Sequence, residues 1–275
     1  MHVQACDSAV QLDPLQNQSP AAAYLDIEQI IRTAKSQGAS LIIPGYGFLS
    51  ESPAFARAIE AEEGLAFVGP TSEQLLLFGD KIRCKDLAKH CGVPLLPGTS
   101  GPQASYEEIL TYVKSLKKGE KAIVKAVAGG GGRGMRVIDP SSASGGQIDQ
   151  LVKEAFESCS REAKAAFGDA RVYAERYLTG AKHIEVQIVG DGTGDVAHLW
   201  DRECSVQRKH QKLIEIAPAP GLDQRVRERL LQYSLRMATA KKYRSLATFE
   251  YLVVPETGEA FLLEVNPRIQ VEHTV

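Results

Sequence analysis

The sequence lacks the features that mark several classes of protein. Its five cysteines are an odd number and form no Cys-x-x-Cys pair, so neither a disulfide framework nor a zinc site is indicated, and a reduced compartment is expected. No apolar run is long enough to cross a bilayer. The formal net charge of −2 gives no electrostatic reason to expect nucleic acid or an anionic membrane as a partner. Any anion must therefore be bound by a local group of basic residues.

The N-terminus also lacks a basic segment followed by an apolar one, and it is not Arg-rich. We therefore expect a cytoplasmic protein, or a mitochondrial one if a transit peptide has been lost. The length of 275 residues, with 44% hydrophobic and 24% charged residues, is ordinary for a soluble globular protein of one large or two modest domains.

The first 95 residues show short alternating strand and helix patterns, which predict a parallel α/β layer. Residues 1–22 are expected to be mainly loop, with one short strand at 9–12. The predicted helices cover residues 24–35, 53–62, 72–77 and 81–90, and the predicted strands cover 41–44 and 65–68. Because a parallel sheet normally has more strands than this, we expect the layer to lack its first βαβ portion.

The Pro/Gly-rich segment at 93–102 is the best domain boundary, and it divides the chain into domains 1–95 and 96–275. The sequence pattern of the second domain predicts antiparallel strands with segregated helices, which is an α+β layer. Its predicted helices lie at 106–116, within 150–165 and at 223–243. Its predicted strands are 122–126, 135–138, 172–177, 184–189, 196–200, 246–254 and 260–265.

The stretch from Phe261 to His273 begins as an apolar strand and then alternates polar residues. These residues are Glu264, Asn266, Arg268, Gln270 and Glu272. A strand has a period of two, so we expect all five side chains on one face. Such a row could hold metal ions beside an anionic substrate, whereas the alternative is a solvated edge strand.

Glu250 lies among apolar residues in A-T-F-E-Y-L-V, and Glu264 lies in F-L-L-E-V. A buried carboxylate needs a cation or a metal to offset its desolvation. The two predicted strands are joined by the turn P-E-T-G-E, so the two carboxylates should be neighbours. Together with the Asn266 oxygen they predict a site suited to Mg²⁺.

The glycine-rich segment at 129–134 fits the spacing G-x-G-x-x-G, but a predicted strand follows it instead of a helix. A dinucleotide-binding turn and a P-loop are therefore both excluded. The remaining interpretation is a glycine-rich hairpin whose N–H groups can face phosphate oxygens, with Lys125 just before it. A plain flexible hairpin is the alternative.

The basic segment from Cys204 to Lys212 is expected to be a loop near a sheet edge, either a solvated face or a source of positive charge for a polyanion such as ATP. Trp200, Tyr177 and Phe249 are expected to be core residues, and Cys204 is expected to be a buried thiol.

Several motifs resemble the biotin carboxylase component of biotin-dependent carboxylases, an ATP-grasp enzyme. They are I-P-G-Y-G-F-L-S-E (43–51), F-V-G-P (67–70), G-D-K (79–81), the glycine segment (124–135), E-R-Y-L (175–178), K-H-I-E-V-Q (182–187), R-E-C-S-V-Q-R-K-H-Q-K (202–212), E-I-A-P-A-P (215–220) and E-V-N-P-R-I-Q-V-E-H-T-V (264–275). The match covers nearly the whole chain. Two of the motifs are most similar to the pyruvate carboxylase type.

The resemblance implies a partial α/β domain followed by an ATP-grasp domain with a glycine-rich lid, and it implies roles for particular residues. Residues expected to bind ATP are Lys81, Lys125, Gly131, Gly132, Glu175, Arg176, Tyr177, Leu178, His183, Gln207, His210, Glu250 and Glu264. Residues expected to hold bicarbonate or biotin are Lys212, Arg268, Gln270 and Val271. Two Mg²⁺ or Mn²⁺ ions are expected on Glu250, Glu264 and Asn266. Catalysis is expected from Glu272 as the general base, with Arg268 and Lys212.

The implied reaction is phosphorylation of bicarbonate to carboxyphosphate, followed by carboxylation of biotin on a separate carrier domain. A carboxyltransferase and a homodimer are further implied partners. The family pattern begins before this chain and continues past it, so we expect a chain cut at both ends with weak or no turnover alone. The alternatives are a non-catalytic ATP- or metal-binding protein and another ATP-grasp ligase, such as a carbamoyl-phosphate synthetase relative. The motifs H-Q-K and R-I-Q-V-E-H disfavour the last of these.

Overall fold

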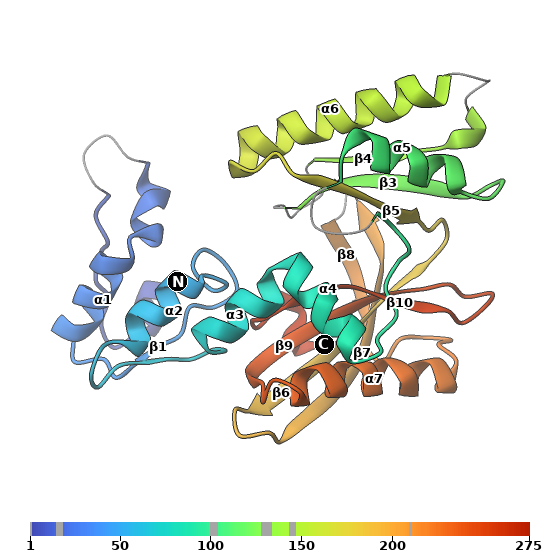
Figure 1. Ribbon diagram of the computed structural model, residues 1–275. Coiled ribbons are helices and arrows are strands. Elements are labelled where there is room, and N and C mark those ends of the chain that lie inside the picture. The colour runs from blue at the N-terminus through green and yellow to red at the C-terminus, as the bar shows by residue number, and fades with distance from the viewer. Residues whose placement is uncertain (1, 15–18, 100–103, 128–133, 143–146, 209–210) are drawn as a thin grey trace.

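The computed structural model describes residues 2–14, 19–99, 104–127, 134–142, 147–208 and 211–275. Within them the chain forms three sheets, each with helices packed against it (Figure 1). The buried apolar residues form three separate clusters, one for each sheet. The expected mixture of a parallel α/β layer and antiparallel α+β layers is confirmed. The division into domains at residue 95 stays a prediction.

The N-terminal layer contains the only parallel strand pair among the described strands, β1 (Leu41–Ile42) with β2 (Ala66–Phe67). Around it lie α1 (Ile27–Ser36), α2 (Pro53–Glu60) and α3 (Ser72–Gly79), preceded by two 3-10 turns, η1 (His2–Ala5) and η2 (Pro20–Leu25). The next helix, α4 (Lys81–His90), packs into the core of the five-stranded sheet described below. The strand predicted at 9–12 is wrong. Val10 is exposed there, and none of the described strands pairs with the segment to fix it in a sheet.

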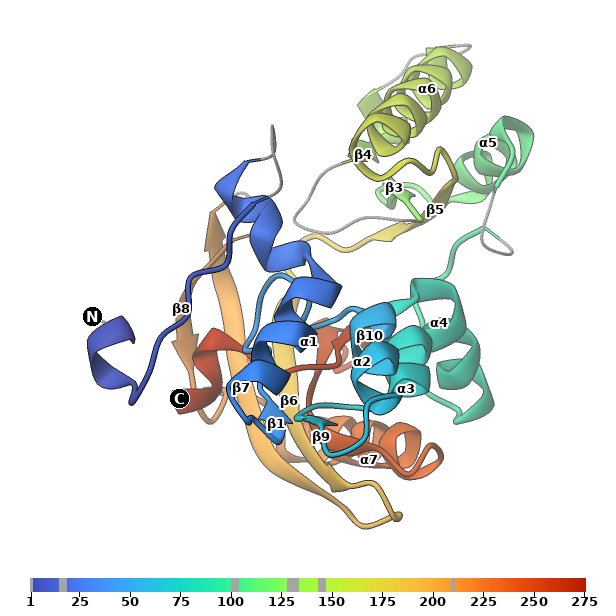
Figure 2. The same cartoon turned by 90° about the vertical axis from the view of Figure 1, so that its left-hand side faces the viewer.

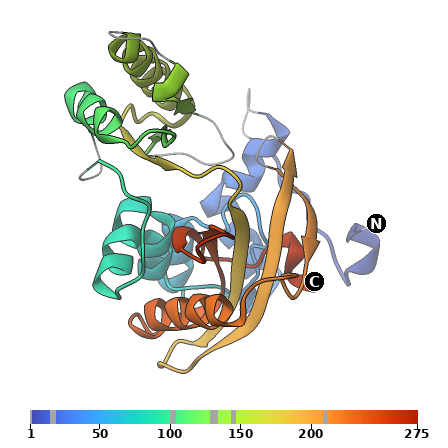
Figure 3. The same ribbon diagram turned by 90° about the vertical axis from the view of Figure 1, so that its right-hand side faces the viewer.

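A three-stranded antiparallel sheet has the order β4-β3-β5. Its elements are α5 (Tyr106–Ser115), β3 (Lys121–Ala126), β4 (Met135–Ile138), η3 (Pro140–Ser142), α6 (Gln147–Phe167) and β5 (Val172–Tyr177). Helices α5 and α6 cover the side of the sheet that faces away from the rest of the molecule (Figure 3). The opposite side therefore faces the larger sheet.

The larger sheet is antiparallel, with the order β10-β9-β6-β7-β8. Its strands are β6 (Lys182–Asp191), β7 (Val196–Arg208), β8 (Gln211–Ile216), β9 (Arg244–Val253) and β10 (Ala260–Asn266), with α7 (Gln224–Thr239) and a terminal 3-10 turn, η4 (Val271–Thr274). Ile184, Val186 and Ile188 alternate along β6 into the core beneath α7. The residues between them, including Glu185, must then point to the opposite face of the sheet.

An extended linker joins the two antiparallel sheets. The N–H of Leu262 on β10 donates to Pro94 O, and the N–H of Arg176 on β5 donates to Pro97 O. A Cβ built on Gly98 would come within 2.4 Å of Ala174 O, so the close approach of the linker to β5 requires glycine. The linker thereby joins the edge strand β10 of one sheet to the edge strand β5 of the other.

Four local expectations are wrong. Strand β10 ends at Asn266, and η4 begins at Val271, because Pro267 has no N–H with which to continue a ladder. The basic segment is largely two paired strands, since β7 extends to Arg208 and β8 starts at Gln211. Trp200 and Tyr177 are 44% and 37% exposed, so they are not core residues, whereas Phe249 and Cys204 are buried as expected.

Candidate functional site

A row of charged residues crosses the polar face of the five-stranded sheet. Glu264 on β10 pairs with Glu250 on β9, Glu250 pairs with Glu185 on β6, and Glu185 pairs with Arg202 on β7. Directly paired residues of antiparallel strands point to the same face. The prediction that Glu250 and Glu264 are neighbours on paired strands is therefore confirmed. Glu185 and Arg202 extend the row and were not predicted.

Lys212 lies at the centre of this row. Its Nζ donates to Glu185 Oε2 at 2.5 Å, to Glu272 Oε1 at 2.9 Å and to Glu250 Oε1 at 3.0 Å. Burial opposes the positive charge, but Glu250 and Glu185 outweigh it and raise the pKa of Lys212 above its ordinary value. The ammonium is therefore a fixed cation that joins three carboxylates from three elements.

His183 orients Glu250 from the neighbouring strand. Its Nε2 lies 2.7 Å from Glu250 Oε2, and its Nδ1 lies 2.8 Å from Gln207 Nε2. Because the Gln207 amide donates, Nδ1 accepts and the Nε2–H points to the carboxylate. Asn266 Nδ2 also donates to Glu250 Oε1, at 2.7 Å. Burial opposes the ionised form, yet His183 and Lys212 lower the pKa of Glu250.

Glu264 is in the opposite electrostatic situation. Burial and the facing Glu250 carboxylate raise its pKa above the ordinary value. Two carboxylates that face one another in a buried place, with an amide beside them, form the oxygen-rich donor set that Mg²⁺ prefers. A divalent cation between them would remove the repulsion that raises the pKa of Glu264, so the residues present fit a metal ion.

Three further carboxylates, those of Glu185, Glu215 and Glu272, have oxygens within 4.8 Å of one another. Lys212 and Arg202 already neutralise this group, since Arg202 Nε donates to Glu185 Oε1 at 2.5 Å. Burial, Glu185 and Glu272 raise the pKa of Glu215 to about 7. The group is therefore better described as a network around Lys212 than as a second metal site.

Lysines gather at the junction of the two antiparallel sheets. Glu175 on β5 accepts from Lys125 on β3 and from Lys85 on α4, the latter at 2.9 Å. Lys81 lies one turn before Lys85, and burial lowers its pKa while Glu264 opposes that shift. Glu175 itself is only 4% exposed, and despite this burial Lys125 and Lys85 lower its pKa.

Arg268 and Gln270 follow the end of β10. Arg268 Nε donates to Glu51 Oε1 at 2.7 Å, a contact with the N-terminal layer that was not predicted. Gln270 is buried and lies between Arg202 and Glu250. The C-terminal turn η4 carries Glu272 back to the sheet beside β7 and β8 (Figure 2).

One cavity of about 890 Å³ is lined by many of these groups. Of the described residues that the sequence predicts for the site, all but Glu175 line it: Lys81, Lys125, Arg176, Tyr177, Leu178, His183, Gln207, Lys212, Glu250, Glu264, Asn266, Arg268, Gln270, Val271 and Glu272. Gly131, Gly132 and His210 lie outside the described residues.

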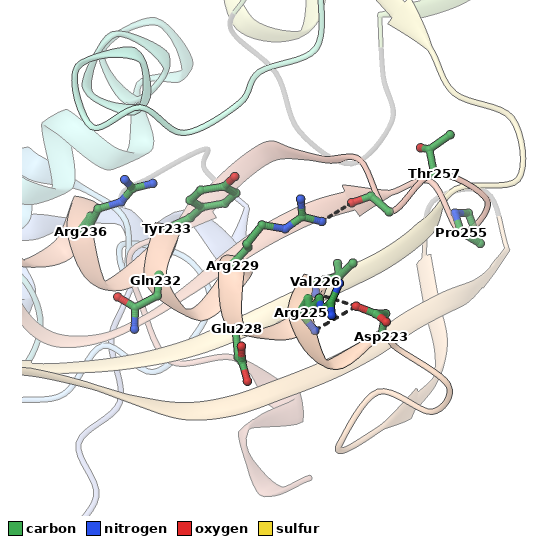
Figure 4. A pocket seen from close by; sticks show the side chains of 11 residues that line it. Asp223, Arg225, Val226, Glu228, Arg229, Gln232, Tyr233, Arg236, Pro255 and Thr257 are labelled. Carbon is green, nitrogen blue, oxygen red and sulfur yellow. Dashed lines mark hydrogen bonds between the residues drawn. The ribbon is translucent and has the colours of Figure 1, made fainter.

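A second hollow of about 840 Å³ lies along the outer side of α7, beside the β9–β10 turn (Figure 4). Arg229 donates to Gly258 O there, and Asp223 caps the helix. None of the described residues that the sequence predicts for the site lines this hollow. The candidate site is therefore the cavity between the two antiparallel sheets.

Sequence reasoning missed several polar residues in or beside this site. Glu215 lines the cavity, whereas Glu51, Lys85, Glu185 and Arg202 contact residues that line it or lie next to it. Glu185 sits among apolar residues in H-I-E-V-Q, which is the same signal that identified Glu250 and could have identified it. Lys85 follows Lys81 by four residues, so both lie on one face of a helix.

Family comparisons agree with this architecture. Residues 1–75 match the family model "Biotin carboxylase, N-terminal domain", and residues 80–275 match "Carbamoyl-phosphate synthase L chain, ATP binding domain". Together with the relatives described next, these matches show that the chain belongs to the biotin carboxylase family, whose ATP-binding part is an ATP-grasp domain.

Among its relatives are carboxylases that are longer than this chain. The chain is 45% identical over 275 residues to a pyruvate carboxylase of Schizosaccharomyces pombe. The aligned region covers 100% of the chain and 22% of the relative. It is also 44% identical over 276 residues to a biotin carboxylase of Pseudomonas aeruginosa. That alignment covers 100% of the chain and 58% of the relative. The chain thus spans only part of the length of both relatives.

Two solved structures are similar throughout the chain. A biotin carboxylase–beta-gamma-ATP complex from Campylobacter jejuni has a TM-score of 0.90 and 38% identity, and covers 100% of this chain and 58% of that one. The biotin carboxylase domain dimer of 2-oxoglutarate carboxylase from Hydrogenobacter thermophilus, with MgADP, ADP and bicarbonate, has a TM-score of 0.86 and 39% identity, and covers 100% and 57%. Among the described residues no helix is long and apolar enough to cross a membrane.

Proposed function

We propose that this chain carries the site of the biotin carboxylase half-reaction, the ATP-dependent carboxylation of biotin with bicarbonate through carboxyphosphate, and that it performs the reaction weakly on its own, as the resemblance leads us to expect. The observation that carries the proposal is the position of Lys212. One ammonium contacts both Glu250, a candidate metal ligand, and Glu272, the candidate base. A nucleotide phosphate bound at the metal and an anion beside the base would therefore lie next to one another, as phosphoryl transfer requires.

The nucleotide is assigned to the side of the cavity nearest the three-stranded sheet. Lys81 and Lys125 supply positive charge for its phosphates, and residues 175–178 on and after β5 supply the adenine site. His183 and Gln207 complete the assignment, as do Gly131, Gly132 and His210 by resemblance. Glu250, Glu264 and Asn266 would hold Mg²⁺ or Mn²⁺, which spreads the developing phosphate charge.

Bicarbonate is assigned to the other side, against Lys212, Arg268, Gln270 and Val271. Glu272 takes the proton from bicarbonate, whose oxygen then attacks the γ-phosphorus as ADP leaves. The pKa of Glu272 supports this role: burial opposes ionisation, but the hydrogen bond from Lys212 keeps the pKa below its ordinary value. Arg268 stabilises the anions that develop.

Three partners follow from the half-reaction. Biotin is expected to arrive on a separate carrier domain, and carboxybiotin would be consumed by a carboxyltransferase. A homodimer is the expected assembly. Support for these partners comes from the chain's similarity to pyruvate carboxylase and to a biotin carboxylase domain dimer.

The proposal is tested by ATP cleavage with the purified chain. ADP release that requires bicarbonate, rises with free biotin and is lost in Glu272→Gln would support it. The exposed Glu256, on the β9–β10 turn, provides the matched control, since Glu256→Gln should behave as the wild type does. Tight ATP binding without any cleavage would instead support the alternative, a non-catalytic ATP- and metal-binding protein.

A further inference from the structure

Glu175 has two lysine partners, and they approach it from different elements. Its Oε1 accepts from Lys125, which lies on β3 in the same sheet, and its Oε2 accepts from Lys85 on α4 at 2.9 Å. Lys125 lies opposite Tyr173 in the sheet register, and Glu175 is two residues further along the same strand. All three side chains therefore share the face that looks toward α4.

The two lysines differ in what else they can reach. Lys125 lines the 890 Å³ cavity assigned to the nucleotide. Lys85 lines only a smaller neighbouring cavity of about 250 Å³, and its Nζ lies 4.2 Å from the centre of the Tyr173 ring. A cation over an aromatic face gains a second stabilising contact. Lys85 is thus held against Glu175 and Tyr173, whereas the Lys125 side chain can also extend into the nucleotide cavity.

The Glu175 carboxylate needs a counter-ion because it is buried. Glu175 is 4% exposed, and a buried carboxylate that loses its only counter-ion is strongly destabilised. If Lys125 were the single partner of Glu175, each movement of Lys125 to a phosphate would leave a buried negative charge without compensation. A second, permanent counter-ion removes this obstacle.

The local charges allow the same conclusion. Lys81, Lys85 and Lys125 surround Glu175 and Glu264 and influence one another's charge state. Three ammonium groups against two carboxylates leave an excess of positive charge when both carboxylates are ionised. That excess favours the binding of an anionic phosphate beside these residues.

We propose that Lys85 is a positioning residue that keeps Glu175 neutralised while Lys125 moves from Glu175 to a nucleotide phosphate. This inference rests on the proposed function, because it requires ATP in the larger cavity. Lys85 does not touch the nucleotide; it acts through Glu175. Its replacement should weaken binding of ATP, whose outer phosphates Lys125 would contact, and should leave AMP binding unchanged.

The experiment measures MgATP and AMP binding by calorimetry for the wild type, Lys85→Met and Lys85→Arg. We expect Lys85→Met to weaken ATP binding about tenfold with AMP affinity unchanged, and Lys85→Arg to stay within about twofold of the wild type for both nucleotides. Lys89→Met removes a cation from the same helix at an exposed position and is the matched control. Lys85→Gln replaces the Met variant if the latter does not fold.

A variant pair separates this role from a direct contact. In a Glu175→Gln background the buried charge is gone, so adding Lys85→Met should cause less than about a twofold further loss. An equal loss in both backgrounds would show that Lys85 contacts phosphate directly and would overturn the inference. So would an equal loss for ATP and AMP, or no loss at all. A wild type that binds no ATP would overturn the proposed function as well, so the two failures can be told apart.

Discussion

Lys212 and Glu272 come from different elements, β8 and η4, and their Nζ and Oε1 atoms are 2.9 Å apart. The same Nζ also contacts Glu250. The candidate base is therefore tied to the candidate metal site through one cation. A change at Glu272, Lys212 or Glu264 should consequently affect different steps of the proposed reaction, and the predictions below separate them.

We expect Glu272→Gln to lower kcat for bicarbonate-dependent ATP cleavage by about 10²–10⁴-fold, the usual contribution of a general base. ATP binding should change little, because Glu272 lies on the bicarbonate side of Lys212. Steady-state kinetics together with calorimetric ATP binding would check this. A large loss of ATP affinity with unchanged kcat would contradict the role of base.

The pH dependence of the same reaction has a definite sign. Burial opposes ionisation of Glu272, but Lys212 keeps its pKa below the ordinary value. The base should therefore stay ionised where a free glutamate is already protonated, and the activity should fall only in more acidic solution than that. Removing the ammonium in Lys212→Met should raise this pKa and shift the acid limb of any residual rate to higher pH. An unshifted acid limb would show that another group controls it.

Lys212→Met should also destabilise the fold. Glu185 and Glu250 are 0% and 4% exposed, and they would lose their shared counter-ion. Loss of one partner from a buried ion pair costs about 3–5 kcal/mol, and the lower end, about 3 kcal/mol, applies to this partly solvated lysine. Urea unfolding measures the change, with the exposed Lys118 mutated to Met as the control. Adding Glu185→Gln should recover part of the loss.

Glu264→Gln separates metal binding from folding. Because burial and Glu250 raise the pKa of Glu264, removing its charge should leave the metal-free chain as stable as the wild type or more stable. The rise in Tm that MgATP produces should, however, shrink by several degrees, since one metal ligand is lost. Thermal unfolding with and without MgATP checks both halves. A variant that keeps the full MgATP shift would exclude Glu264 as a ligand.

The sequence predicted that Glu250 and Glu264 are neighbours because a hairpin turn joins their strands. Their direct pairing depends on a β-bulge between Leu262 and Glu264, which the sequence did not indicate. The prediction failed immediately afterwards, where the alternation of polar residues continues beyond the strand. Pro267 ends β10, and Arg268, Gln270 and Glu272 reach the cavity from an irregular segment and a 3-10 turn. The period-two alternation therefore identified residues that do lie near the site, but they do not reach it from a strand as the alternation predicted.

Contacts between distant elements could not be predicted. Glu51 and Arg268 are 217 residues apart, and nothing in the local pattern of either motif indicates the other. Lys85 was not predicted for a similar reason, since its partner Glu175 is 90 residues away in the sequence. A single sequence reports periodicity and turn chemistry, whereas these pairs depend on how separate layers pack.

Glu215 offers a test of the network that does not depend on activity. Burial, Glu185 and Glu272 raise its pKa to about 7, above the value of about 4.3 expected in an unfolded chain. Between these two values the folded state binds more protons than the unfolded state, so this carboxyl lowers the stability as pH rises from about 4 to 7. Above pH 7 the full cost is present.

Glu215→Gln removes that cost because the amide does not ionise. The variant should therefore equal the wild type near pH 4 and exceed it above pH 7 by about 1–2 kcal/mol, a value reduced for partial solvent screening. Urea unfolding across pH 4–8 measures the difference, and Glu157→Gln, at an exposed site on α6, should show none. A difference that does not grow with pH would mean that Arg202 and Lys212 already keep Glu215 ionised, and the four carboxylates around Lys212 would then all be charged together.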